Sequence, residues 1–277
     1  MTYREKTSTT TDIQNVQYAD DLTLVAKSRE DLQVMVDTLD RVCTKWGMAI
    51  NGAKTKTMVV GAETDSEQPA ITLKDETLEA VETFSYLGSE VGKTARVDGD
   101  VSARLKKAAT VYQMWRRKVF RSRSVSRGTK VRVFRVMVMS VLLYGAETWA
   151  VTQQDLRRLH AFQMKCLRDI VGVTLWHKRR NVDILAETGE MPVKDLLKVR
   201  RLQWFGHLQR MPDHRPQRQV LKCRPQGKKR KPGGTALRWI DVVNRDLSKI
   251  ANWEELVNDR NLWRSTIHQL LIGQPAQ

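Results

Sequence analysis

Tyr18-Ala19-Asp20-Asp21 stands between Ile13-Gln14-Asn15-Val16-Gln17 and Leu22-Thr23-Leu24-Val25-Ala26. Both flanks are rich in residues that favour β-strands and are short enough to pair directly, so the sequence predicts a β-hairpin with two carboxylates at its tip. Two-metal phosphoryl transfer needs hard oxygen ligands that hold Mg²⁺ ions roughly 4 Å apart. Adjacent aspartates are also common at ordinary solvated turns, so the pair alone does not define a metal site.

The segment after the hairpin is predicted to be a helix from Ser28 to Trp46. Ser28 is a suitable N-cap and Asp31 follows three residues later. One face of this helix carries an apolar stripe and the other is charged, so the helix should cover one side of a sheet. The stripe consists of Leu32, Met35, Val36, Leu39, Val42, Cys43 and Trp46.

Further β-structure is expected downstream. Met58-Val59-Val60 is predicted to be a short apolar strand. Ile71–Leu73 and Leu78–Val81 flank Lys74-Asp75-Glu76 and indicate a second hairpin, which is followed by Phe84-Ser85-Tyr86-Leu87-Gly88.

The order and spacing of these parts resemble the back half of the palm of a reverse transcriptase of the kind that non-LTR retrotransposons encode. In that family the Tyr-Ala-Asp-Asp turn holds catalytic metal. A helix and an Asn-x-x-Lys-Thr-like segment follow, and here Asn51-Gly52-Ala53-Lys54-Thr55 stands at that point. A Tyr-Leu-Gly hairpin then grips the primer end. The resemblance extends from about residue 13 to the C-terminus.

The resemblance implies specific roles. Asp20 and Asp21 would be catalytic ligands of two Mg²⁺ ions in the intact polymerase. Lys54 or Lys56 would lie near the incoming deoxynucleotide triphosphate, where a lysine could neutralise or protonate the departing pyrophosphate. An ordinary solvated loop is the alternative for both lysines. Tyr86-Leu87-Gly88 would form the primer grip.

The same comparison indicates that one catalytic aspartate of the family has no counterpart here. Polymerases of this family use a further metal-binding aspartate on an earlier strand, and only seventeen residues precede Tyr18. Asp12 is eight residues from Asp20 along the expected strand, about 26 Å away at 3.3 Å per residue, so it cannot share the metal. We therefore expect a fragment without the fingers, the front of the palm or an endonuclease domain, and one that is not a competent polymerase alone.

The charge distribution points to nucleic acid independently. The chain carries a net charge of +17, yet residues 1–100 hold 11 Lys and Arg against 18 Asp and Glu. The remaining 177 residues therefore carry +24. Val101–Ala146 contains 12 basic residues and His214–Ile240 contains 9, and neither stretch contains an acid. Binding to polyphosphate would relieve the self-repulsion of such stretches.

The first basic stretch has helical periodicity. Leu105, Ala108, Tyr112, Trp115 and Val119 form an apolar stripe, and a second helix is predicted from Thr129 to Tyr144. The apolar run Val136–Ala146 is far shorter than the roughly 20 residues needed to cross a bilayer, so no membrane partner is expected. By resemblance this region is the helical thumb, whose phosphate contacts track an RNA template paired with a DNA primer. Its candidate binding residues are Arg104, Lys106, Lys107, Arg116, Arg117, Lys118, Arg121 and Arg123.

Helices are also expected beyond Ala150. One would bury Leu156, Leu159, Cys166, Leu167 and Ile170, and another Val193, Leu196, Leu197, Trp204 and Leu208. Two terminal helices, Leu237–Ile250 and Trp253–Leu271, should bury Leu247, Ile250, Trp253, Leu256 and Trp263. Base stacking by Trp204, Phe205 and Trp239 is possible, but core positions are favoured over it for these three, as they are for Tyr112 and Trp115.

A Pro-, Gly- and Lys-rich connector separates these helices. Within it, Lys228, Lys229, Arg230 and Lys231 could act as a phosphate-binding tether or a nuclear import signal, which favours a nuclear over a cytoplasmic location. Three cysteines without a signal peptide indicate a reducing compartment. Cys43 and Cys166 are expected to be core thiols. Cys223, His207 and His214 offer three zinc ligands and not four, so zinc is not expected.

The sequence thus predicts an α+β protein. Its parts are a partial reverse-transcriptase palm of antiparallel hairpins plus a helix, then a mainly helical basic thumb and C-terminal region. The expected boundaries are 1–92, 93–150, 151–211, 212–235 for the connector and 236–277. The predicted function is that of a fragment of an RNA-directed DNA polymerase. The alternatives are a non-enzymatic RNA- or DNA-binding protein and a decayed transposon product.

Overall fold

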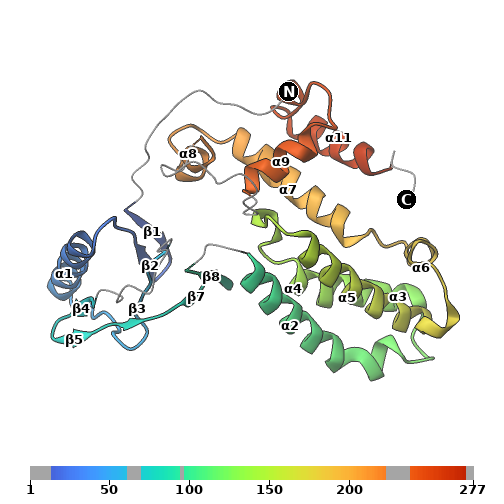
Figure 1. Ribbon diagram of the computed structural model, residues 1–277, viewed down its shortest axis with the longest axis horizontal. Helices are drawn as coiled ribbons and strands as arrows, with labels where there is room; N and C mark the ends of the chain where they lie inside the picture. The colour runs from blue at the N-terminus through green and yellow to red at the C-terminus, as the bar shows by residue number, and fades with distance from the viewer. Residues whose placement is uncertain (1–13, 61–69, 94–96, 223–237, 273–277) are drawn as a thin grey trace. The chain divides into compact units, whose positions relative to one another are not determined.

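The computed structural model (Figure 1) describes residues 14–60, 70–93, 97–222 and 238–272. The chain divides into two compact units, with the boundary between residues 96 and 97. We refer to residues 9–96 as the N-terminal unit and to residues 97–277 as the helical unit. The N-terminal unit combines short strands with one long helix, so the protein as a whole has the predicted α+β character.

The N-terminal unit begins with the predicted acidic hairpin. Strands β1 (Asn15–Tyr18) and β2 (Asp21–Leu24) pair antiparallel, with Tyr18 opposite Asp21. Helix α1 (Arg29–Lys45) follows, and the Ser28 side chain accepts a hydrogen bond from the Asp31 backbone N–H, as the capping pattern predicts. The start and end of this helix agree with the sequence prediction.

The apolar stripe of α1 is only partly covered. Val36 is buried, and Leu32 packs with it against the small core of this unit. The last residues of the stripe, Val42 and Trp46, are exposed, and Trp46 retains 73% of its accessible surface. The predicted stripe therefore contacts the small core of this unit near Leu32 and Val36 and not at its C-terminal end.

The remaining strands of the N-terminal unit are shorter than predicted. Met58–Val60 is not a strand; the strand precedes it, because the pairing partner Glu79–Ala80 aligns with Lys56–Thr57. The second hairpin exists, but its second strand is Glu76–Thr77 and not the predicted Leu78–Val81, so its turn consists of Lys74 and Asp75. These strands are β3 (Lys56–Thr57), β4 (Thr72–Leu73), β5 (Glu76–Thr77), β6 (Glu79–Ala80), β7 (Thr83–Tyr86) and β8 (Ser89–Gly92), of which β3 and β6 are parallel and β4–β5 and β7–β8 antiparallel.

Side-chain hydrogen bonds connect α1 to the backbone of Ala70 and Thr72, at the start of β4. Gln33 accepts from the Thr72 backbone N–H at 2.9 Å and donates to its carbonyl at 2.8 Å, which mimics a strand pairing. Arg29 donates to the Ala70 carbonyl. The buried apolar side chains described in this unit are Val36, Ile71, Leu73 and Leu78.

The helical unit contains the helices predicted from periodicity, and two of them pass into π-helical turns at their C-terminal ends. Its first half comprises α2 (Asp98–Trp115), η1 (Arg116–Phe120), α3 (Arg127–Val133), η2 (Phe134–Met139), α4 (Ser140–Leu142), η3 (Ala146–Thr148) and α5 (Gln153–Val171). Its second half comprises η4 (Leu175–His177), α6 (Asn181–Thr188), α7 (Val193–Gln209), α8 (Pro216–Lys222), α9 (Trp239–Leu247), α10 (Trp253–Leu256) and α11 (Arg260–Ile272).

Two apolar clusters stabilise the helical unit. The larger one contains Tyr112, whose ring stacks on Phe120 with centroids 5.0 Å apart, so Tyr112 is a core residue as predicted. Cys166 is fully buried in the same cluster, whereas Cys43 of the N-terminal unit is only half-buried. The smaller cluster joins α7 to the C-terminal helices through Phe205 and Trp263.

Three features of the helical unit differ from the prediction. The predicted connector contains helix α8 at Pro216–Lys222. The expected helix Trp253–Leu271 is broken into α10 and α11, because Asp259 accepts the backbone N–H groups of Asn261 and Leu262 and starts a new helix. Helix α6 was not predicted. Cys223 and Lys228–Lys231 lie outside the described residues.

The aromatic residues at the end of α7 and the start of α9 differ in accessibility. Phe205 is buried, and the Trp239 indole donates to the Glu147 carbonyl at 2.8 Å. Trp204 is half-buried beside His207. In the part of the chain that the structure describes, no helix has the length and apolar character required to span a bilayer.

Candidate functional site

The acidic hairpin presents its carboxylates to solvent. Asp20 and Asp21 are both exposed, and Tyr18 beside them is exposed too. The turn residue Ala19 has a φ of +52°, a conformation that an L-residue other than Gly, Asn or Asp rarely adopts. Such strain persists only where the surrounding structure fixes it, and it is common at functional turns.

The donor chemistry of this tip suits Mg²⁺ but the number of donors falls short of a two-metal site. Exposed carboxylates are the hard ligands that Mg²⁺ prefers. Across the described residues, however, no three side chains of His, Cys, Asp or Glu gather closely enough to hold a metal ion. Asp12, which the sequence argument excluded by distance, lies outside the described residues.

The two candidate lysines have different surroundings. Lys56 pairs with Glu79 across β3 and β6, so its charge is already partly compensated. Lys54 is exposed on a turn that Asn51 organises, since the Asn51 side chain accepts the Lys54 backbone N–H at 3.1 Å. Of the two, Lys54 is the more exposed side chain.

The Tyr-Leu-Gly segment forms the tip of the β7–β8 hairpin. Leu87 and Gly88 both have positive φ, +47° and +83°, which is the geometry of a tight type I′ turn. The Tyr86 hydroxyl is buried and has no hydrogen-bond partner among the described residues. The segment is therefore a tight hairpin turn, and the Tyr86 hydroxyl next to it has no hydrogen-bond partner among the described residues.

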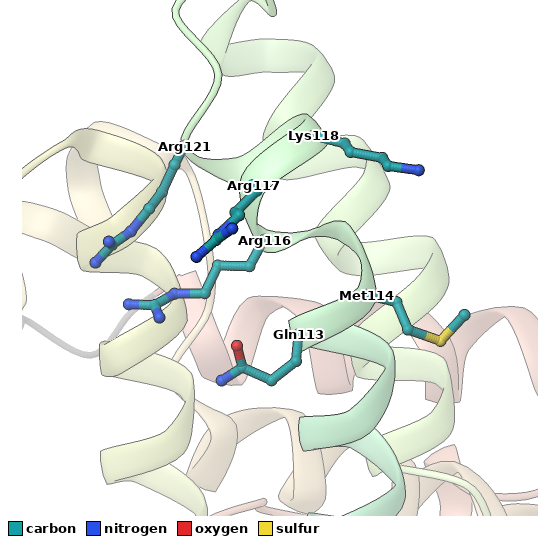
Figure 2. A pocket seen from close by; sticks show the side chains of 6 residues that line it. All are labelled: Gln113, Met114, Arg116, Arg117, Lys118 and Arg121. Carbon is teal, nitrogen blue, oxygen red and sulfur yellow. The ribbon is translucent and has the colours of Figure 1, made fainter.

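A basic pocket lies at the junction of α2 and η1. It has a volume of about 380 Å³ and is lined by Gln113, Met114, Arg116, Arg117, Lys118 and Arg121. Figure 2 shows Arg116, Arg117 and Arg121 extending to one side of the helix, with Lys118 directed the other way. Four of the predicted nucleic-acid-binding residues, Arg116, Arg117, Lys118 and Arg121, thus line one pocket.

A carboxylate from another helix organises this pocket. Asp169 of α5 accepts from Arg116 Nε at 2.7 Å and from Arg121 at 2.8 Å, and the Tyr112 hydroxyl donates to it as well. Burial raises the pKa of this carboxyl, but the hydrogen bonds that it accepts from Arg116, Arg121 and Tyr112 outweigh burial and lower the pKa to about 2. The carboxylate is therefore charged at neutral pH and fixes two guanidiniums at the pocket wall.

Arg104 is a correction to the sequence analysis. Its side chain is buried, its guanidinium lies 4.2 Å from the Tyr144 ring centroid, and its Nε lies 3.9 Å from Asp100. A buried arginine cannot reach a phosphate backbone, so we remove it from the candidate interface. Its α2 neighbours Lys106 and Lys107 are exposed, as are Arg117, Lys118 and Arg123.

Sequence reasoning missed the acids that neutralise the acid-free stretch. Glu187 pairs with Arg127 at 2.8 Å, and Glu190 pairs with Arg135 at 2.7 Å. These acids, like Asp169, lie more than 45 residues from their partners. Asp169 lies in α5 and Glu187 in α6, whereas Glu190 follows the end of α6, so the three acids share no local sequence pattern that predicts these pairs.

Comparison with known proteins supports the resemblance drawn from the hairpins. Residues 2–91 match the family described as reverse transcriptase (RNA-dependent DNA polymerase). The N-terminal unit is therefore similar to part of a reverse transcriptase. An uncharacterized transposon-derived protein of Caenorhabditis elegans is 24% identical over 270 residues, which cover 92% of this chain and 95% of that protein.

A second relative is an RNA-directed DNA polymerase from the mobile element jockey of Drosophila funebris. It is 21% identical over 173 residues, which make up 60% of this chain and 19% of that polymerase. This chain thus matches about a fifth of the length of a polymerase named as such. No solved structure matches the chain significantly.

Proposed function

We propose that this chain carries the end of the palm and the thumb of a non-LTR reverse transcriptase, and that by itself it binds an RNA template paired with a DNA primer. The observation that carries this proposal is the basic pocket between α2 and η1, in which Asp169 holds two of the three arginines, Arg116 and Arg121. A fixed guanidinium loses little side-chain entropy when it binds phosphate, and its fork matches the phosphate oxygens.

A salt titration with an RNA–DNA hybrid tests the binding proposal. The logarithm of the association constant should fall linearly with the logarithm of salt concentration, because each phosphate contact releases counterions. The substitutions Arg117→Ala and Lys118→Ala should each lower the steepness of that dependence by about 1. The matched control is Arg264→Ala, which removes an exposed cation from α11, far along the chain from the pocket.

The comparison with Arg264→Ala shows whether the pocket is a preferred binding site. If Arg264→Ala changes the salt dependence as much as Arg117→Ala does, the whole basic surface binds without a preferred site, and the pocket has no special role. If affinity does not change with salt at all, phosphate contacts are absent and the proposal fails.

For the intact polymerase we propose that Asp20 and Asp21 hold Mg²⁺, that Lys54 or Lys56 contacts the triphosphate of a deoxynucleotide, and that Tyr86–Gly88 grips the primer. A bound Mg²⁺ would supply charge stabilisation at the transferring phosphoryl group. The pair supplies fewer carboxylates than a two-metal site requires, so polymerase activity is proposed only for a chain that includes the upstream part of a palm.

Primer extension on an RNA template with Mg²⁺ tests this second part. The chain should be inactive, a version extended upstream to supply the rest of the palm should be active, and Asp20→Asn in the extended version should abolish activity. Asp37→Asn, an exposed carboxylate on α1, is the matched control. Full activity in the Asp20→Asn protein would refute the metal role.

A non-enzymatic nucleic-acid-binding protein is the second candidate function. The absence of a three-ligand cluster from the described residues favours it. It predicts that the extended version is also inactive and that Asp20→Asn leaves binding unchanged. A decayed product without selected function predicts, in addition, that the pocket variants bind like the wild type.

A further inference from the structure

The most exposed large apolar side chain among the described residues is Trp176, at 91% of its accessible surface. It lies in the short turn η4 between α5 and α6, beside Leu175, which is 76% exposed. No ring contact or hydrogen bond of the Trp176 indole occurs within the part of the chain that the structure describes. Covering apolar surface of this size with a binding partner is favourable.

The backbone around Trp176 is held in a defined conformation. Gly172 ends α5 with a φ of +81°. The His177 ring nitrogen Nδ1 lies 3.1 Å from the Thr174 backbone nitrogen and 2.9 Å from its hydroxyl oxygen, and the Lys178 backbone N–H donates to the Leu175 carbonyl at 3.0 Å. These bonds close the turn on both sides of Trp176, so the backbone from which the indole projects has a defined conformation.

The charges next to the indole are positive. Lys178, Arg179 and Arg180 follow it directly, and residues 172–182 contain no acid. Arg179 pairs with Glu187 at 2.6 Å and Arg180 pairs with Asp183 at 2.9 Å, but the Arg180 side chain is still largely exposed. Exposed ion pairs of this kind are worth little in water, so a phosphate can replace the carboxylate at small cost.

We infer that Trp176 is a stacking platform for an unpaired base of single-stranded nucleic acid, with Lys178 and Arg180 contacting the adjacent phosphates. This inference rests on the proposed nucleic-acid binding and adds a second site of different specificity. An indole favours single strands, because their bases expose the π-faces that a duplex keeps stacked inside. The positive charge favours a polyanion over an apolar protein groove as the occupant.

The test compares two fluorescent RNA probes of equal length, a single strand without self-pairing and an RNA–DNA hybrid. Trp176→Ala should weaken binding of the single strand by roughly 5- to 150-fold, and binding of the hybrid by less than about twofold. Trp176→Phe should keep most of the single-strand affinity. The steepness of the salt dependence should not change, because no phosphate contact is lost. Trp46→Ala, which removes the other strongly exposed tryptophan, is the matched control.

The outcomes separate the two proposals. Failure of the wild type to bind either probe refutes the proposed function. Normal binding of both probes by the wild type, with no single-strand loss in Trp176→Ala, overturns only the stacking inference. Equal losses on both probes, or loss of self-association measured by light scattering, would also overturn it, the latter by identifying a second copy as the occupant. Unchanged melting temperature of Trp176→Ala verifies that folding is unaffected.

Discussion

Asp169 shows how one residue can organise a surface that is otherwise entirely cationic. Its carboxylate accepts hydrogen bonds from Arg116 and Arg121, and the hydroxyl of Tyr112 donates to it from the core. The pKa of Tyr112 is raised in turn, first by burial and then by this hydrogen bond. The phenol therefore stays protonated and remains a donor to Asp169.

Asp169→Asn should lower the free energy of unfolding by about 1–3 kcal/mol, because two guanidiniums lose their counter-charge at a partly buried position. Thermal or urea unfolding measures this. Arg121→Gln is the milder comparison, since the Arg121 side chain is half-exposed and its pair contributes less. Equal effects of the two substitutions would contradict the organising role of the carboxylate.

The pH dependence of stability provides a separate check. The folded-state pKa of Asp169 is about 2, below the ordinary value of 3.8. Its contribution is therefore complete above about pH 4 and is lost as pH falls toward 2. The stability difference between the wild type and Asp169→Asn should shrink by about 1–2 kcal/mol over that interval. A constant difference would mean that the carboxylate does not titrate as described.

Arg104 and Lys106 lie one half-turn apart on α2 and should behave in opposite ways. Arg104→Ala should destabilise the fold by about 1–3 kcal/mol, because its stem and charge are packed against Tyr144 and Asp100. It should leave the salt dependence of nucleic-acid binding unchanged. Lys106→Ala should do the reverse. Unfolding curves and salt titrations on both variants test this, and a reduced salt dependence in Arg104→Ala would restore its predicted binding role.

At the scale of elements, the contact between α7 and α11 depends on one glycine. A Cβ atom at Gly206 would overlap with the indole of Trp263, whose Nε1 donates to the Leu202 carbonyl at 2.9 Å. Gly206→Ala should therefore destabilise the protein by about 1–3 kcal/mol through overpacking. Gly128→Ala is the control, because a Cβ there meets nothing within 4 Å and removing a helical glycine stabilises by about 0.5–1 kcal/mol.

The sequence predicted elements well where the signal is local. Ser28 and Asp31 defined the start of α1, and the apolar spacing defined α5 and α7 within a few residues. It failed for the position of β3 and for the pairing of β6, because these strands contain two residues each and pair across 23 positions. Strands this short have no periodicity, and their pairing is decided by where the chain between them returns.

At the scale of the whole molecule, the two units differ in how much apolar surface they bury. The described core of the N-terminal unit has four buried apolar residues, whereas the helical unit has two larger clusters. Backbone amides of α1 should therefore exchange with solvent much faster than those of α5, as measured by hydrogen exchange. Equal protection would show that the N-terminal unit is as stable as the helical unit.

For the candidate site too, the sequence predicts the features that depend on neighbouring residues and not those that depend on contacts between distant helices. The hairpin tip with Asp20 and Asp21 follows from neighbouring residues, and the position of Arg117 and Lys118 on a helix follows from periodicity. The burial of Arg104 and the ion pair between Arg116 and Asp169 could not be predicted from the sequence, because both depend on helices that contact each other only in the folded unit. Trp176 was not singled out, since an exposed and a buried tryptophan look alike in a sequence.

The long separation between the pocket arginines and Asp169 has a consequence for synthesis of the chain. Arg116 and Arg121 precede their shared carboxylate by 53 and 48 residues. Because a ribosome adds roughly 5–20 residues per second, these arginines leave it several seconds before Asp169 does. During that interval the two guanidiniums lack the counter-charge that Asp169 supplies in the folded unit. When α5 folds against α2, Asp169 pairs with both guanidiniums, and the same step forms the pocket.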